Sequence, residues 1–427
     1  MIDEKIIEIL KKELVVAMGC TEPAASALAG SKASELLGCV PDAVTVFASR
    51  DMVKNAMAVG IPNCKERGIL TAVCLGIFSE NPIKDLSILS VVTERQREMA
   101  KKLAEVSSLE LEENAPSVYV RVDARGGGHT SSCTISYEHD RFTRLLKDGR
   151  EQPLPGNCGK RGQAEREETF LKSLTLEDVV NFVRRVDKEQ IRFVLDSART
   201  NYQLSCYSIE HDYGLKTAKT ALADLPKQPS NLHEAMTFAA AYAAAGSDAR
   251  MSGCPQAVVI NSGSGNQGIT CSVPLVVLAD YLGSSESQLI EALCLSQIIG
   301  LMITARKSRL SALCGALTAA MGAGCGMVHL MGGGLDEMNR VICNMVGNLA
   351  GIICDGAKNS CALKIFSSVE AAGLAVRMAF NGEAPGREGG IIGGDAMESI
   401  ENLMNVSKNG MENTDRVILS IMLDKQS

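Results

Sequence analysis

The chain has 427 residues, a formal net charge of −7 and a pI near 5.5. A chain of this length exceeds what one hydrophobic core usually supports, so we expect two or three domains. The acidic balance argues against nucleic acid or an anionic membrane as the main partner. The lack of Trp, with only 4% aromatic residues, argues against a platform for stacking bases.

Fifteen cysteines are many for such a chain. The N-terminus is charged and has no apolar signal core, so we expect a cytoplasmic protein with free thiols rather than an exported disulfide scaffold. Most of these cysteines are expected to be small buried hydrophobes. Residues 251–279 and 310–335 carry no formal charge, but Pro and Asn interrupt the first stretch, and the second is rich in Gly and Ala. We therefore expect buried helices there, not membrane spans.

The chain begins with an amphipathic pattern. Residues 3–17 place apolar side chains at helical spacing among charges, which predicts a helix. It leads into the loop 19–23, where Thr21 is the expected N-cap of a second helix over 24–37. Cys20 then lies just outside a helix N-terminus, where the partial positive charge favours a thiolate.

The next part of the chain has a mixed texture. Runs of β-branched and aromatic residues predict strands, at 44–47, 118–122 and 133–137. The Gly-, Pro- and charge-rich segment 140–170 predicts an exposed loop, and 175–225 predicts amphipathic helices.

A proline-rich stretch at 225–230 predicts a linker. Beyond it, Ala-, Gly-, Met- and Ile-rich segments predict helices almost throughout. The expected fold class is therefore α+β, with an N-terminal mixed domain over 1–228 that includes the Cys20 loop. A mainly helical domain that carries the site chemistry is expected over 229–427.

Two polar motifs predict a site for a small anion. The loop 261–268 has consecutive exposed N–H groups before a helix but lacks the residues of a P-loop or a dinucleotide fingerprint. We interpret it as a cradle for a substrate carboxylate, with a structural turn as the alternative. Its candidate binding residues are Asn261, Ser262, Gly263, Ser264, Asn266 and Gln267. Lys54 and Asn55, ahead of a Gly/Pro turn, are a second candidate, and a solvated face is the alternative.

Three cysteines in apolar, glycine-rich surroundings are metal-ligand candidates. Cys354 and Cys361 lie seven residues apart, and Cys314 lies forty residues before Cys354. This spacing is not that of ferredoxins or zinc fingers, so three core cysteines remain the alternative. The Gly/Asp/Asn loop between Cys354 and Cys361 favours metal, because such loops donate N–H groups to sulfur ligands. Cys325 and Cys343 are competing candidates.

At these residues the chain resembles the iron–sulfur L-cysteine desulfidases, which are related to the alpha chain of bacterial iron–sulfur L-serine dehydratases. The matching stretches are 19–24, 54–55, 59–62, 261–268, 314–316, 353–358 and 361–364. The resemblance implies that Cys314, Cys354 and Cys361 bind a 4Fe-4S cluster with one open iron. It also implies that Cys20 is the catalytic base.

The expected function is β-elimination of L-cysteine to sulfide, pyruvate and ammonia, with the cluster as a non-redox Lewis acid. Such a carbon–sulfur lyase needs no pyridoxal phosphate, and no lysine lies in the phosphate-binding context of that cofactor. Its partner is then a small molecule, with no nucleic acid and no membrane, and a homo-oligomer is left open. The alternatives are L-serine dehydration by the same residues, or a non-catalytic zinc-binding or helical structural protein.

Overall fold

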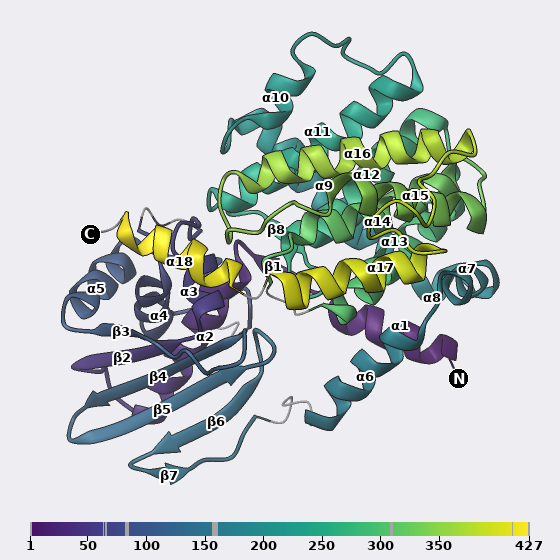
Figure 1. Cartoon of the computed structure of the whole chain (residues 1–427). Helices are drawn as coiled ribbons and strands as arrows, with labels where there is room; N and C mark the ends of the chain where they lie inside the picture. The colour runs from purple at the N-terminus through teal and green to yellow at the C-terminus, as the bar shows by residue number, and fades with distance from the viewer. Residues whose placement is uncertain are drawn as a thin grey trace.

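The computed structural model describes residues 2–62, 64, 66–81, 85–155, 161–307, 311–411 and 413–425, without the side chains of 161–164. The chain forms two lobes, one built on a β-sheet and the other on helices (Figure 1). Their hydrophobic interiors form two main clusters of buried side chains. The predicted α+β class is confirmed.

The sheet lobe contains a six-stranded sheet with the order β3-β2-β4-β5-β6-β7. Only the β2–β3 pair is parallel among the described pairs of this sheet. The strands are β2 (Ala43–Ala48), β3 (Ser108–Leu111), β4 (Tyr119–Gly126), β5 (His129–Ser136), β6 (Phe142–Lys147) and β7 (Arg150–Glu151). The predicted strands at 44–47, 118–122 and 133–137 fall on β2, β4 and β5.

Helices cover one face of this sheet (Figure 1). They are α2 (Thr21–Leu37), α3 (Arg50–Ala56), α4 (Ile69–Ile77) and α5 (Glu94–Glu105). In β4 the alternation of a strand sends Val120 and Val122 into the core, while Arg121 and Asp123 lie on the other face. The polar-apolar alternation is thus what fixes which face the helices cover.

The helical lobe is built around long apolar helices. Its helices are α1 (Ile2–Glu13), α6 (Arg161–Ser173), α7 (Leu176–Arg185), α8 (Lys188–Ile191), α9 (Phe193–His211), α10 (Thr217–Leu222), α11 (Leu232–Met251), α12 (Gly265–Leu282), α13 (Glu286–Arg306), α14 (Gly315–Leu330), α15 (Leu335–Leu349), α16 (Cys361–Phe380) and α17 (Ala396–Asn405). In the described chain, α13 alone is long and apolar enough to cross a membrane, and 78% of its apolar window is buried inside the protein.

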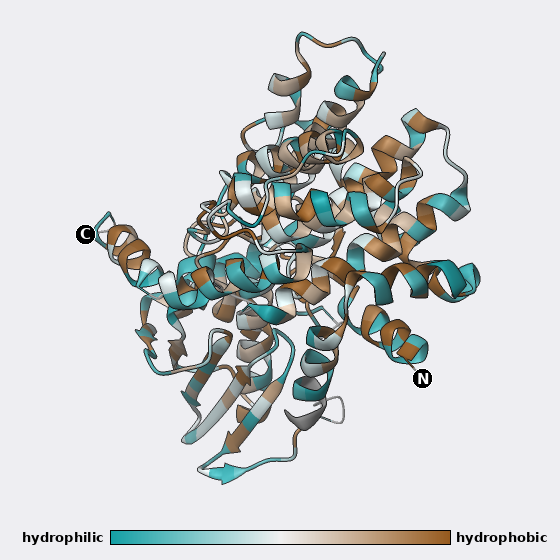
Figure 2. Cartoon of the chain, turned by 45° about the vertical axis from the view of Figure 1, so that its right-hand side comes forward, coloured by the Kyte–Doolittle hydropathy of each residue, from teal (hydrophilic) through white to brown (hydrophobic). Residues whose placement is uncertain are grey.

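The chain passes from the helical lobe to the sheet lobe near each of its ends. Strand β1 (Val16–Met18) pairs antiparallel with β8 (Ala257–Val259), which places the start of the chain beside the helical lobe. After the short π-helix η1 (Val406–Gly410), the last helix, α18 (Thr414–Asp424), returns to the sheet lobe, where it packs on α3. Figure 2 shows mixed teal and brown along the helices next to both termini, as expected where one face packs and the other meets solvent.

The predicted loop over 140–170 is wrong in its described part, since β6, β7 and α6 lie there. Pairing with β5 and packing against α13 outweigh the polar composition, while residues 156–160 lie outside the described chain. The division into 1–228 and 229–427 stays a prediction. In the structure, buried side chains of α1, α7 and α9 share the core of the later helices.

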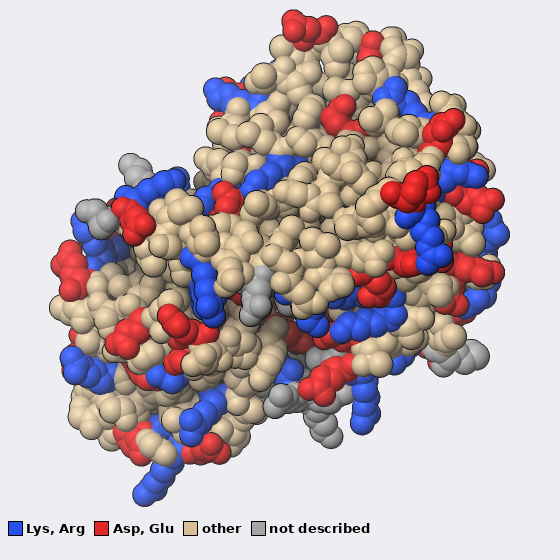
Figure 3. All heavy atoms as spheres, in the orientation of Figure 1, with Lys and Arg blue, Asp and Glu red and all other residues tan. Residues whose placement is uncertain are grey.

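Charged side chains of both signs are mixed over the sheet lobe, as Figure 3 shows. On the same view the helical lobe has a broad uncharged area in its middle, and charges gather towards its edges. The described cysteines are free thiols, as expected, and Cys158 lies outside the described residues.

Candidate active site

A small cavity of about 90 Å³ lies where the two lobes meet, and we call it the thiol cavity. Its walls come from the starts of α2, α12, α14 and α16, from α3 and from the end of α11. Of the twelve residues predicted for the site, eleven line it, namely Cys20, Lys54, Asn55, Ser262, Gly263, Ser264, Asn266, Gln267, Cys314, Cys354 and Cys361. Segments far apart in sequence are therefore brought together here.

A β-bridge places two of the cysteines side by side. Leu313 and Ile353 pair in this bridge, and the Cys314 N–H donates to the Ile352 carbonyl at 3.0 Å. Cys314 is the N-cap residue of α14. Cys361 is the first residue of α16, so two sulfur side chains stand at helix N-termini, where partial positive charge favours thiolates.

The Cys314–Cys354 pair favours one thiolate. The pKa of Cys354 is lowered to about 5 by a hydrogen bond from Cys314 and by the charge of Lys54, although burial opposes the shift. The same hydrogen bond, together with burial, raises the pKa of Cys314. Burial raises the pKa of Cys361 to about 11. Cys354 is thus the most acidic of the three.

The donor set fits a cluster better than a single ion. No three His, Cys, Asp or Glu side chains of the described chain are grouped closely enough to hold one metal ion. A four-iron cluster is ligated by cysteine thiolates, and the cavity offers three of them. Backbone groups of Ala316 and Gly356 also donate hydrogen bonds to the sulfurs of Cys314 and Cys354, which favours thiolates.

Cationic side chains surround these sulfurs. Lys54 and Lys307 are almost fully buried, and the Lys307 ammonium donates to the Leu313 carbonyl at 3.1 Å. Lys364 forms an ion pair with Asp355 in the loop between Cys354 and Cys361. Because thiolates and a cluster that they ligate carry net negative charge, this positive environment suits them.

Cys20 lies at the N-cap of α2, one residue before the cap that the sequence predicts. The expectation that the helix end lowers the pKa of the Cys20 thiol is wrong. Burial raises the pKa of Cys20, and the nearby Arg250 guanidinium opposes this only in part. Desolvation of a fully buried thiol therefore outweighs the partial charge of the helix end.

The opposite wall contains polar residues that sequence reasoning missed. Glu22 is buried and accepts a hydrogen bond from the Asn55 amide at 2.9 Å. Burial alone would raise the pKa of Glu22, but the charges of His139 and Arg250 outweigh it and lower that pKa. Arg250, at the end of α11, donates through Nε to the Gly19 carbonyl at 3.0 Å. In the sequence, the position of Arg250 at the end of an Ala-rich segment was the pattern that could have indicated a buried cation at the site.

One acceptor in this wall has no partner. The Oδ1 atom of Asn55 is buried and receives no hydrogen bond within the described chain. Buried polar atoms are nearly always satisfied, so an orphan acceptor in a cavity is a position for a ligand donor.

The loop before α12 forms a tight turn. Asn261 and Ser264 exchange backbone hydrogen bonds of 3.1 and 2.9 Å, and Ser262 and Gly263 both have positive φ, +52° and +76°. Non-glycine residues adopt such angles at a cost, which a functional position often explains. The Thr21 hydroxyl donates to the Gly263 carbonyl at 3.0 Å and so ties this turn to α2.

Asn261 is the predicted residue that does not line the cavity. It is fully buried behind the turn, and its Nδ2 donates to the Gln297 side chain at 2.7 Å. Its Oδ1 accepts from the Ser262 hydroxyl at 2.8 Å. Asn261 therefore orients the turn and cannot contact a ligand in the cavity.

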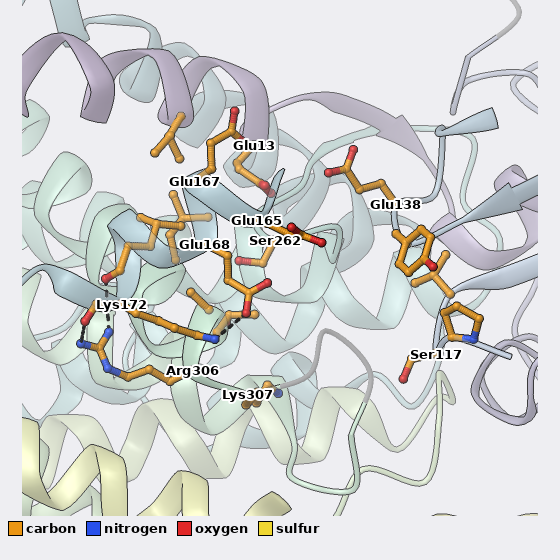
Figure 4. A pocket seen from close by; sticks show the side chains of 18 of the residues that line it. Glu13, Ser117, Glu138, Glu165, Glu167, Glu168, Lys172, Ser262, Arg306 and Lys307 are labelled. Atoms are coloured by element: carbon orange, nitrogen blue, oxygen red, sulfur yellow. Dashed lines mark hydrogen bonds and ion pairs between the residues drawn. The ribbon is translucent and has the colours of Figure 1, made fainter. Parts of the chain in front are cut away.

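A larger cleft of about 360 Å³ adjoins the thiol cavity, and Ser262 and Lys307 line both. Figure 4 shows glutamates of α6 around this cleft, including Glu168, which accepts a hydrogen bond from Lys172 at 2.5 Å. Ser117 and Glu138 contribute from the sheet lobe. The cleft is the candidate route by which a small solute would reach the thiol cavity.

The fold and site define a two-lobed protein with a cavity of cysteine, lysine and amide side chains between its lobes. Residues 83–420 match the family described as serine dehydratase alpha chain, and the chain belongs to this family. The family expected from the sequence motifs is confirmed at this level.

Full-length relatives carry the name UPF0597 protein. One from Oleidesulfovibrio alaskensis is 38% identical over 424 residues, which cover 99% of this chain and 98% of the relative. One from Bacteroides fragilis is 37% identical, with 99% and 98% covered, and one from Clostridium perfringens is 36% identical, with 99% of each covered.

Proposed function

We propose that the protein is an L-cysteine desulfidase, a carbon–sulfur lyase that converts L-cysteine to sulfide, pyruvate and ammonia. The observation that carries the proposal is the meeting of Cys20, Cys314, Cys354 and Cys361 in one cavity with the turn before α12. The cavity is well below the roughly 300–1,000 Å³ of sites for drug-sized ligands, so it suits a small substrate.

Cys314, Cys354 and Cys361 are the residues that would hold the 4Fe-4S cluster. When bound, such a cluster would supply a Lewis-acidic iron for the sulfur leaving group of the substrate. Lys54 and Lys307 would offset negative charge at the sulfur ligands.

The polar wall can orient an amino acid. The Glu22 carboxylate and the orphan Oδ1 of Asn55 are acceptors for an α-ammonium group. The guanidinium of Arg250 and the N–H groups of residues 262–263 are donors for the α-carboxylate. The acceptors and donors together hold the Cα–H bond at the cavity centre, beside Cys20.

Cys20 is then the group that takes the α-proton. Burial raises the pKa of the Cys20 thiol, so this thiol must lose its proton before it can act as a base. The Cys20 proton is released to solvent when the substrate binds, and the substrate ammonium group against this wall then favours the Cys20 thiolate that takes the α-proton. After proton removal the C–S bond breaks, sulfide leaves, and the resulting 2-aminoacrylate hydrolyses to pyruvate and ammonia.

Dehydration of L-serine is the second candidate, favoured by the family name. Cysteine is preferred here because thiolate is a softer ligand than a hydroxyl group and suits iron in sulfur-rich surroundings. Both reactions use the same ammonium and carboxylate contacts, so only the leaving group separates them.

The test begins with protein reconstituted with iron and sulfide in the absence of oxygen. Iron, zinc and acid-labile sulfide are measured per chain, and sulfide and pyruvate release is followed with L-cysteine and with L-serine. We expect iron and sulfide to be bound and kcat/KM to be higher for L-cysteine. A higher value for L-serine would establish the dehydratase instead.

Cysteine variants supply the matched control. Cys354→Ala should lose iron, whereas Cys206→Ala, on α9 outside the cavity, should retain it. Zinc binding without turnover of either amino acid would support a structural metal protein and overturn the proposal.

A further inference from the structure

The largest fully buried side chain of the described part is that of Lys54, which is 1% exposed. A buried ammonium is costly unless it is paired. Its partner is Asp415 on the C-terminal helix α18, which forms an ion pair with Lys54, while Asp51 lies 3.9 Å away. A carboxylate from the very end of the chain thus satisfies a cation of the thiol cavity.

Helix α3, which carries Lys54, is held from two sides. On one side α18 packs against it, and Leu419 of α18 is buried in the core of the sheet lobe (Figure 1). On the other side the loop between Cys354 and Cys361 lies against its backbone, where the Lys358 ammonium donates to the Lys54 carbonyl at 3.2 Å. Helix α3 thus contacts both the C-terminal helix and the cysteine loop.

The ion pair changes the expected role of Lys54. Asp415 takes one of the three N–H donors of the Lys54 ammonium and balances its charge, which weakens its attraction for a substrate carboxylate. The charge of Lys54 acts instead on Cys354, with which it interacts favourably. The side chain thus belongs to the sulfur end of the cavity rather than to the carboxylate end.

We propose that Asp415 is a positioning residue of the thiol cavity, whose carboxylate fixes the Lys54 ammonium beside Cys354. The inference about Asp415 deepens the proposed function. Its kinetic test rests on that function, whereas its labelling test does not. The C-terminal helix thereby sets the charge next to the sulfur ligands, although it does not line the cavity.

The first test measures Lys54 directly in full-length, metal-free protein. Acetic anhydride labelling is followed by peptide mass spectrometry in the wild type, Asp415→Asn and Asp415→Glu. Loss of the carboxylate should increase labelling of Lys54, and glutamate should bring it back towards the wild-type level. Glu8→Gln, which makes the same charge change on an exposed position of α1, should have no effect.

The second test is a double-mutant cycle on the reconstituted enzyme. Displacement of a catalytic neighbour by about 1 Å can cost 10²-fold, so Asp415→Asn should lower kcat by about 10- to 100-fold with little change in KM. If Asp415 acts through Lys54, Asp415→Asn should add nothing to Lys54→Met. Partial rescue by Asp415→Glu is expected as well.

Two results would overturn the inference. Either Lys54 labelling is unchanged in Asp415→Asn, or the two substitutions lower kcat additively. The labelling test does not depend on the reaction. If Asp415→Asn changes the labelling of Lys54 but the wild type does not turn over L-cysteine, the proposed function is refuted and the role of Asp415 stands.

Discussion

Gly356 is the contact between the cysteine loop and helix α3. Its φ is +89°, and a Cβ atom there would overlap the Lys54 carbonyl oxygen and lie 3.1 Å from the Cα of Asn55. Gly356→Ala must therefore push the loop away from α3 as well as adopt an unfavourable backbone angle. Because the loop carries Cys354 and precedes Cys361, we expect both stability and iron binding to fall.

The magnitude follows from two contributions. A left-handed backbone angle costs an alanine roughly 1–2 kcal/mol. Overpacking against backbone that cannot move freely costs about 1–3 kcal/mol more. The expected loss in the free energy of unfolding is thus about 2–5 kcal/mol. Gly332→Ala is the matched control, since Gly332 has a φ of +80° and a Cβ atom added there would have nothing within 4 Å.

Urea unfolding of the metal-free variants gives the difference in unfolding free energy, and reconstitution gives iron per chain. Gly332→Ala should show the backbone cost alone and normal iron content. The reasoning is refuted if Gly356→Ala loses no more stability than Gly332→Ala, or if it binds iron as well as the wild type does.

Three further predictions concern single side chains. Cys20→Ala should keep the cluster iron and abolish turnover, and full activity of this variant would exclude Cys20 as the base. Arg250→Lys keeps the charge but loses the planar fork, so KM should rise by about 10-fold with iron content unchanged, and an unaltered KM would remove Arg250 from the carboxylate site. Asp178 forms a capping box with Thr175, whose hydrogen bonds lower the pKa of Asp178 below its ordinary 3.8. Its stabilisation is therefore present above that value and lost as pH falls through the lower folded pKa. The difference in thermal midpoint between the wild type and Asp178→Asn should shrink as the pH falls below 3.8, and a constant difference would contradict this.

Local patterns predicted much of the site because they act over short distances. The cap region at Cys20 and the turn before α12 are readable from a few neighbouring residues, since helix starts and tight turns depend on local backbone chemistry. The cysteine motif at 354–361 is readable in the same way. What these patterns leave undetermined is which segments meet.

Tertiary contacts decided the rest. The bridge between Leu313 and Ile353 sets Cys314 beside Cys354 across forty residues, and the Lys54–Asp415 pair joins residues 361 positions apart. Arg250 reaches the cavity only because α11 ends beside Gly19. Burial then reversed the expected pKa shift of Cys20, because desolvation depends on everything packed around a group, which the sequence near it does not contain.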